Sequence, residues 1–126
     1  MNRFWLGVGL LLLLLGISIT TSLYLDNIHG QITDILNQAG DAAISGDLDT
    51  ATAFVMQAQQ IWQKHWHLTA LVIDHGPVDE IDGMFAQIEA YGQAGEMPEF
   101  AACCAGTARM VQAVGESHSL TWWNLF

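Results

Sequence analysis

The fold is decided by residues 28–62, IHGQITDILNQAGDAAISGDLDTATAFVMQAQQIW. On both sides of Ser45-Gly46 the apolar residues recur every three or four positions, which is the spacing of one face of an α-helix. They are Ile28, Ile32, Ile35, Leu36, Ala39 and Ala43, then Ala51, Phe54, Val55, Ala58, Ile61 and Trp62. Asp47 or Asp49 can cap the second helix. The stretch therefore predicts an antiparallel helical hairpin.

The C-terminal half of the chain repeats this pattern. Gly76-Pro77 ends the first hairpin, a third apolar face runs from Val78 to Tyr91, and Pro98 suits the first turn of a fourth helix. A shift of 49 residues places Gly46-Asp47-Leu48 on Gly95-Glu96-Met97 and keeps the apolar register. Duplication explains this agreement, and so do two unrelated amphipathic hairpins of equal length. Either way, we expect an all-α domain of two antiparallel hairpins.

An uncharged apolar segment precedes the first hairpin. Residues 4–25 carry no charge, and as a helix they measure about 33 Å, enough for a hydrocarbon core of about 30 Å. Trp5 and Tyr24 lie near its two ends, where membrane interfaces favour aromatic rings. A cleaved signal peptide and a buried soluble helix are the alternatives, but no A-x-A-like cleavage site follows. We expect residues 1–25 to anchor the domain of residues 26–126.

The charges lie unevenly along the chain. All 13 acidic residues fall after residue 25, against only Lys64 and Arg109 there, so residues 26–126 carry a net charge of -11. Such an acidic surface repels phosphates and anionic lipids, which excludes nucleic-acid binding and a polybasic membrane contact. Arg3 lies before the apolar segment, and Asp26 and Asp34 follow it. The positive-inside rule therefore predicts a cytoplasmic N-terminus and an extracytoplasmic C-terminal domain.

No motif for catalysis or phosphate binding is visible in the sequence, so we expect no enzymatic activity and no cofactor. The low-ranking candidates for a metal site are His65, His75, Asp74 and Asp79, which lack the spacings of known zinc motifs. Cys103 and Cys104 are adjacent, a geometry that strains a disulfide. We therefore expect two small buried thiols, with redox or metal chemistry as the alternative.

Aromatic residues are the best candidates for a binding surface. The partner-binding candidates are Trp62, Trp66, Trp122, Trp123 and Phe126. Trp62 and Trp66 are one helical turn apart, and the other three close the chain. The C-terminal residues 119–126 have three interpretations: they cover the helical core, dock a partner, or touch the bilayer interface, where Trp is favoured.

Several short segments, in this order and spacing, resemble a family of unknown function, DUF4363. They are Trp62-Gln63-Lys64-His65-Trp66, Leu71-Val72-Ile73-Asp74-His75, Val78-Asp79-Glu80-Ile81-Asp82, Ala90-Tyr91 and Ser119-Leu120-Thr121-Trp122-Trp123-Asn124-Leu125-Phe126. Members of this family are small membrane-anchored helical proteins of clostridial-type bacteria. The resemblance implies a helical fold and an anchored topology, and it implies no activity.

These observations lead to three hypotheses for the function, of which the weakest is a hydrolase of the cell envelope. The first is a non-enzymatic, single-pass protein of the cell envelope, whose helical domain binds a protein partner or self-associates. The second is an envelope sensor that binds a metal or small ligand through the histidines and acidic residues near residues 65–82.

Overall fold

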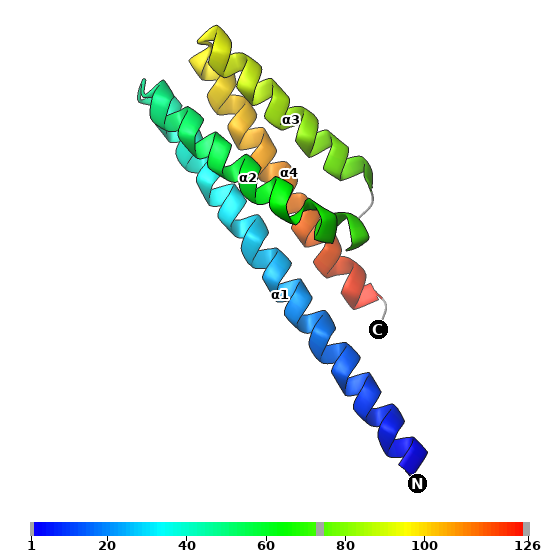
Figure 1. Cartoon of the computed structure of the whole chain (residues 1–126). Coiled ribbons are helices and arrows are strands. Elements are labelled where there is room, and N and C mark those ends of the chain that lie inside the picture. The colour runs from blue at the N-terminus through cyan, green and yellow to red at the C-terminus, as the bar shows by residue number, and fades with distance from the viewer. Residues whose placement is uncertain (1, 73–74, 125–126) are drawn as a thin grey trace.

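The computed structural model describes the backbone of residues 2–72 and 75–124, and the side chains of residues 2–65 and 76–115. The described chain forms four helices and no strand: α1 (Asn2–Ile44), α2 (Leu48–Val72), α3 (His75–Ala94) and α4 (Met97–Asn124). The all-α prediction is confirmed, with the helix boundaries close to the Gly and Pro positions that predicted them (Figure 1).

The helices pair as two hairpins that pack against each other. In the described structure α1 lies against α2 and α4, and α3 lies against α4 and α2, whereas α1 and α3 do not touch. The turns α1–α2 and α3–α4 lie at one end of the bundle, and the end of α2 and the start of α3 lie toward the other (Figure 1). This cyclic order of antiparallel neighbours is typical of an up-down-up-down four-helix bundle.

One helix contains both the apolar N-terminal segment and the first element of the bundle. α1 runs unbroken for 43 residues, about 64 Å, and its N-terminal half extends beyond the other helices (Figure 1). By length and composition this helix is able to cross a membrane, and its apolar segment is exposed, which does not fit a buried soluble helix. Burial begins at Leu25, whose side chain is 1% exposed.

Hydroxyl groups near the C-terminal end of the apolar segment bond within the helix. Thr20 Oγ1 donates to the Gly16 carbonyl at 2.8 Å, and Thr21 Oγ1 donates to the Ile17 carbonyl at 2.9 Å. Because these polar groups are satisfied locally, they add little to the cost of placing this turn against lipid.

The two hairpin turns have the same geometry. Gly46 and Gly95 adopt positive φ values of 85° and 71°, the left-handed conformation that ends helices. In each turn the amide after the glycine donates back to a helix carbonyl: Asp47 N–H to Ala42 O at 2.9 Å, and Glu96 N–H to Tyr91 O at 3.0 Å. The turns are thus related by the same shift of 49 residues as the apolar pattern.

The start of α2 settles which aspartate caps it. The Thr50 N–H donates to Asp47 Oδ1 at 3.2 Å, and the Thr50 hydroxyl donates to Asp47 Oδ2 at 2.6 Å. Asp47 therefore satisfies an amide at the start of α2 that has no partner within the helix, and Asp49 lies inside its first turn.

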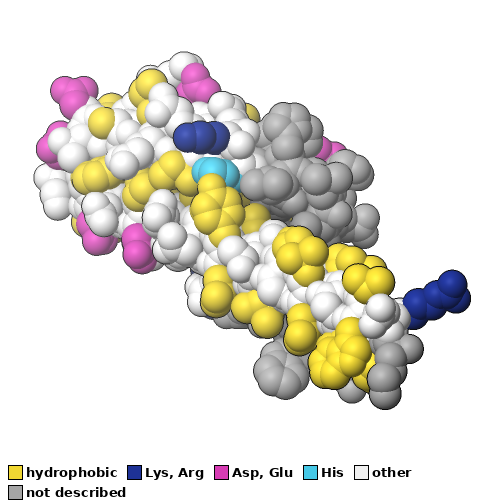
Figure 2. Space-filling model, turned by 60° about the horizontal axis from the view of Figure 1, so that its bottom comes forward, with side chains coloured by type: hydrophobic (Ala, Val, Ile, Leu, Met, Phe, Trp, Pro, Cys, Tyr) yellow, Lys and Arg dark blue, Asp and Glu magenta, His cyan; other side chains and the backbone are white. Residues whose placement is uncertain are grey.

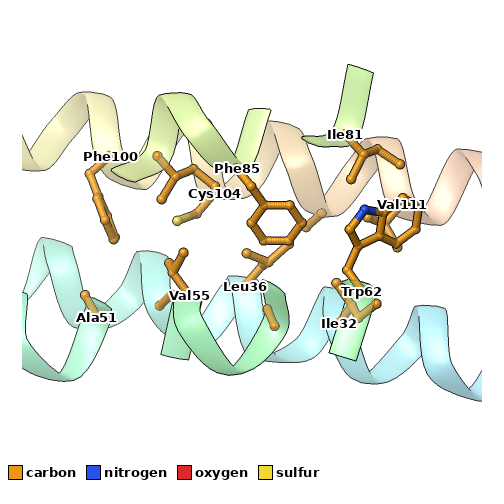
Figure 3. Close-up of a cluster of buried hydrophobic side chains, with 14 of the residues drawn as sticks. Ile32, Leu36, Ala51, Val55, Trp62, Ile81, Phe85, Phe100, Cys104 and Val111 are labelled. Carbon is orange, nitrogen blue, oxygen red and sulfur yellow. The ribbon is translucent and has the colours of Figure 1, made fainter. Parts of the chain in front are cut away.

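The core is built from positions that correspond under this shift (Figure 3). The buried pairs are Ile32 and Ile81, Leu36 and Phe85, Ala51 and Phe100, Val55 and Cys104, and Trp62 and Val111. In two of these pairs, Ala51 with Phe100 and Val111 with Trp62, a small residue in one hairpin corresponds to a large one in the other. The two hairpins share a register but fill the core with different shapes, so their side chains interdigitate as close packing requires.

Both cysteines are free thiols, as their adjacency predicts. Cys104 lies in the core, and Cys103 is half-buried, with Sγ 3.7 Å from the Met84 carbonyl oxygen. Burial raises the pKa of the Cys104 thiol to about 12, with the neighbouring Cys103 as a second cause. Cys104 therefore behaves as a small apolar side chain.

Candidate functional site

A groove runs between α2 and α3 in the half of the bundle near the hairpin turns. Its volume is about 360 Å³. It is lined by Thr52, Val55, Met56, Gln59, Ile88, Glu89, Gly92, Gln93 and Phe100. Val55, Ile88 and Phe100 are buried and form an apolar floor, whereas most of the remaining lining residues are polar and lie at the rim. Such a combination of apolar floor and a few polar groups is typical of binding sites.

The absence of a side chain at Gly92 shapes the floor of this groove. A Cβ atom there would lie 3.3 Å from Phe100 Cε2, closer than ordinary contact. The glycine therefore lets the Phe100 ring lie directly against the α3 backbone. Beside it, Met56 is 56% exposed, and its flexible thioether can adapt to the shape of a bound group.

Trp62 connects α2 to α3 on the side of the groove that is farther from the hairpin turns. Its indole Nε1 donates to Asp82 Oδ1 at 2.8 Å, and its side chain is only 1% exposed (Figure 3). Its hydrogen bond and large buried surface stabilise the contact between the two hairpins. This burial is a correction to the prediction that Trp62 offers a surface to a partner.

A second aromatic contact lies where α1 enters the bundle. The Tyr24 hydroxyl and His65 Nδ1 are 3.3 Å apart, and their rings meet edge to face at a centroid distance of 5.5 Å. Sequence reasoning treated Tyr24 only as an interface residue and His65 only as a metal candidate. Tyr24 lies 22 residues before Gly46 and His65 lies 19 residues after it, so the turn places both at roughly the same level of the hairpin without pairing them directly.

A polar cleft of about 330 Å³ separates α1 from α4 close to the same level. It is lined by Asp26, His29, Gly30, Thr33, Asp34, Gln112 and Gly115. The helices approach closely at Gly115, where a Cβ atom would lie 3.0 Å from His29 Nδ1. Its composition is polar, unlike that of the groove between α2 and α3.

Comparison with known proteins supports the family resemblance. A family model described as a domain of unknown function, DUF4363, matches residues 19–125, which is most of the chain. The chain belongs to the DUF4363 family. No curated protein and no solved structure matches it. The DUF4363 match begins inside the apolar segment and extends through all four helices, so the family model includes the end of that segment as well as the bundle.

The metal candidates of this DUF4363 protein are not brought together where their side chains are described. His65 contacts Tyr24, and Asp79 is exposed on the first turns of α3. Among residues 2–65 and 76–115, no three His, Cys, Asp or Glu side chains form a group that could hold a metal ion. Asp74 and the side chain of His75 lie outside the described residues.

The remaining aromatic candidates of the DUF4363 chain fall partly outside the described structure. The side chains of Trp66, Trp122 and Trp123 are not among the described ones, and Phe126 is outside altogether. The backbone shows that residues 119–124 continue α4 as helix. Residues 119–124 therefore form the last part of the fourth helix, which ends at Asn124.

Proposed function

We propose that this DUF4363 protein is a single-pass membrane protein whose extracytoplasmic helical domain binds a protein partner and has no enzymatic activity. The observation that carries the proposal is the groove between α2 and α3, because it combines an apolar floor with a polar rim. Among the described side chains, no group of His, Cys, Asp and Glu favours the metal-binding alternative.

The membrane anchor is supported by the exposure of the apolar half of α1. Large side chains such as Leu12 and Ile17 are more than half exposed along this segment. Figure 2 shows hydrophobic side chains gathered along this narrow part of the molecule, with Asp and Glu side chains around its wide end. With Arg3 on one flank and Asp26 on the other, the charges favour an N-terminus in the cytoplasm.

The groove fits an amphipathic segment of another protein that carries Lys or Arg beside its apolar residues. Val55, Ile88 and Phe100 would bury the apolar side chains of that segment. Glu89 lies on the rim, and the domain that surrounds it has a net charge of -11. This charge favours a basic partner and accelerates its association, since opposite charges steer encounter.

Site-specific photo-crosslinking in intact cells tests the proposal. A photoreactive amino acid replaces Met56 on the groove rim, and in a matched control it replaces Asp41, which is exposed on α1. We expect Met56 to crosslink to one protein through a peptide that contains Lys or Arg beside apolar residues. Glu89→Lys should reduce this adduct several-fold, because it reverses a charge on the rim.

The other outcomes are equally informative. Identical adducts from Met56 and Asp41, or no adduct from either, would contradict a docking function for the groove. An adduct to a second copy of the same chain would replace a separate partner with self-association. Insensitivity of the adduct to Glu89→Lys would rule out a basic occupant.

A further inference from the structure

We propose that residues 117–124, the last two turns of α4, lie in the outer interface of the same bilayer that α1 crosses. The domain would then touch the membrane through a second element. The inference rests on membrane insertion of residues 4–25, which belongs to the proposed function, and it is independent of the groove between α2 and α3.

The antiparallel register of α1 and α4 places this segment. Gly40 lies against Ala101 and Cys104, and further along, Thr33 Oγ1 is 3.5 Å from the Ala108 carbonyl oxygen. Gly115 then lies against His29. Each step toward the C-terminus of α4 is thus matched by a step toward the N-terminus of α1.

Extending this register locates the end of α4 beside the apolar segment. Nine residues separate Gly115 from Asn124, a rise of about 13.5 Å. The same number of residues from His29 leads back to Thr20 on α1. Figure 1 agrees with this level: α4 runs past the start of α3 toward the protruding half of α1.

The distribution of charge gives an independent argument. Asp26 is the first charged residue of α1 after the apolar segment, and Glu116 is the last of α4. The register sets these two residues at nearly the same level. Lys64, the last charged residue of α2, precedes His65, which contacts Tyr24 at that level as well. Along α1 and α4, the formal charges therefore end at one level, as expected at the boundary of a bilayer.

The sequence beyond this plane has the chemistry of a membrane interface. Residues 117–124 contain no Asp, Glu, Lys or Arg, and they include Trp122 and Trp123. Trp is enriched at the headgroup level, where its ring contacts acyl chains and its N–H contacts water. The bilayer that α1 crosses would also surround the end of α4 at that depth. We therefore expect lipid, and no protein partner, to contact residues 117–124.

Depth measurements on spin labels test the inference. The full chain, with Cys103→Ser and Cys104→Ala, is reconstituted into phosphatidylcholine vesicles. Single cysteines are introduced at each position from 117 to 124, and their nitroxides are exposed to oxygen or to a water-soluble nickel complex. Leu12→Cys serves as the control within the anchor, and Asp49→Cys as the control in water.

We expect the ratio of oxygen to nickel accessibility to rise from residue 117 to residue 124 on the face away from α1. It should reach the ratio measured for Ser22→Cys. Nickel accessibility equal to that of Asp49→Cys along residues 117–124 would overturn the inference, and so would protection from both reagents at all eight positions. If Leu12→Cys is itself accessible to nickel, the membrane anchor fails instead.

Discussion

The contact between Trp62 and Asp82 shows how a single polar atom constrains the bundle. The indole ring is buried between α2 and α3, yet its N–H needs an acceptor because an unsatisfied buried donor is costly. Asp82 supplies that acceptor from an exposed position, so its carboxylate keeps contact with water. The pair joins the two hairpins without burying a charge.

Removing either partner of this pair should destabilise the protein. Asp82→Ala leaves the indole N–H without its acceptor, and we expect a loss of about 1–3 kcal/mol in the free energy of unfolding. Trp62→Phe should cost a similar amount. The double variant should lose less stability than the sum of the two single losses. We expect the difference, which is the coupling energy, to be about 1–2 kcal/mol when measured by denaturant unfolding.

The control for this cycle is Asp79→Ala, which removes an exposed carboxylate from the same helix. It should change stability by less than about 0.5 kcal/mol. A coupling near zero between Trp62 and Asp82 would show that the hydrogen bond contributes nothing to stability.

The capping of α2 by Asp47 should depend on pH. The hydrogen bond from the Thr50 hydroxyl, followed by that from the Thr50 amide, holds the pKa of Asp47 below its usual value of 3.8. A lowered folded-state pKa gives stability above pH 3.8, which is lost as the pH falls through the folded-state value. Asp47→Ala should therefore lower the melting temperature by a few degrees at pH 7.

The difference between Asp47→Ala and the parent should fade as the pH falls below the lowered pKa. Asp47→Asn is the matched control, because asparagine caps helices without titrating. Its melting temperature should stay close to that of the parent at pH 7. A pH-independent effect of Asp47→Ala would contradict the contribution of the carboxylate.

The two thiols should differ in reactivity. With a pKa of about 12, Cys104 forms a thiolate in about one molecule in 10,000 at pH 8, and burial also blocks access. Burial raises the pKa of Cys103 as well, but this side chain is partly accessible. Iodoacetamide should add once at most to the folded protein and twice in urea, as measured by intact mass. Rapid double modification of the folded protein would contradict the burial of Cys104.

At the scale of the elements, the two turn glycines set the lengths of the hairpins. Gly46 and Gly95 occupy left-handed conformations that a residue with a Cβ atom enters only at a cost. Because both turns close at equivalent positions, the apolar faces of α1 and α3, and of α2 and α4, align without slippage. The shift of 49 residues is therefore the number of residues from one turn glycine to the other.

Alanine substitution should have opposite effects on stability at these two turn glycines and at a glycine inside a helix. Gly46→Ala and Gly95→Ala should each destabilise the protein by about 1–2 kcal/mol, because both need a positive φ. Gly83 is exposed in the middle of α3 and has open space where a Cβ atom would lie, so Gly83→Ala should stabilise by about 0.5–1 kcal/mol. Thermal unfolding of the three variants checks the sign of each change. Equal effects at all three sites would contradict the role of the turns.

The helices were predictable from the sequence because burial repeats with the helical period, as at Ile32, Leu36 and Val55. The contact between Tyr24 and His65 follows only once the turn at Gly46 is known, since it depends on counting along two helices. The groove was out of reach, because its width depends on the separation of α2 and α3, which belong to different hairpins. Apolar periodicity assigns residues to a face and does not report how far apart two faces lie.

For the whole molecule, the chain divides between two environments. The exposed apolar half of α1 suits lipid, and the acidic bundle suits water. In the proposed topology the bundle lies outside the cytoplasm. This arrangement brings the groove between α2 and α3 to the part of the domain farthest from the membrane, where a partner can reach it.

Labelling with a membrane-impermeant maleimide checks this topology in intact cells. In a chain with Cys103→Ser and Cys104→Ala, Asp49→Cys should react without permeabilisation, whereas Asn2→Cys should react only after it. The expected reason is the bias of positive charge, which holds Arg3 on the cytoplasmic side. The reverse pattern would invert the topology, and labelling of both sites in intact cells would exclude a membrane-spanning α1.

In the proposed topology, the unbroken helix α1 transmits a tilt of its apolar segment to the bundle. From Leu25 to Ile44 the helix continues for about 29 Å beyond the apolar segment, with no hinge at the membrane surface. A helix tilts when its apolar length exceeds the local bilayer thickness. A tilt of about 10° at the membrane would move the far end of the helix by about 5 Å and carry the attached bundle with it. In the proposed topology, thinning or thickening of the lipid would therefore displace the groove.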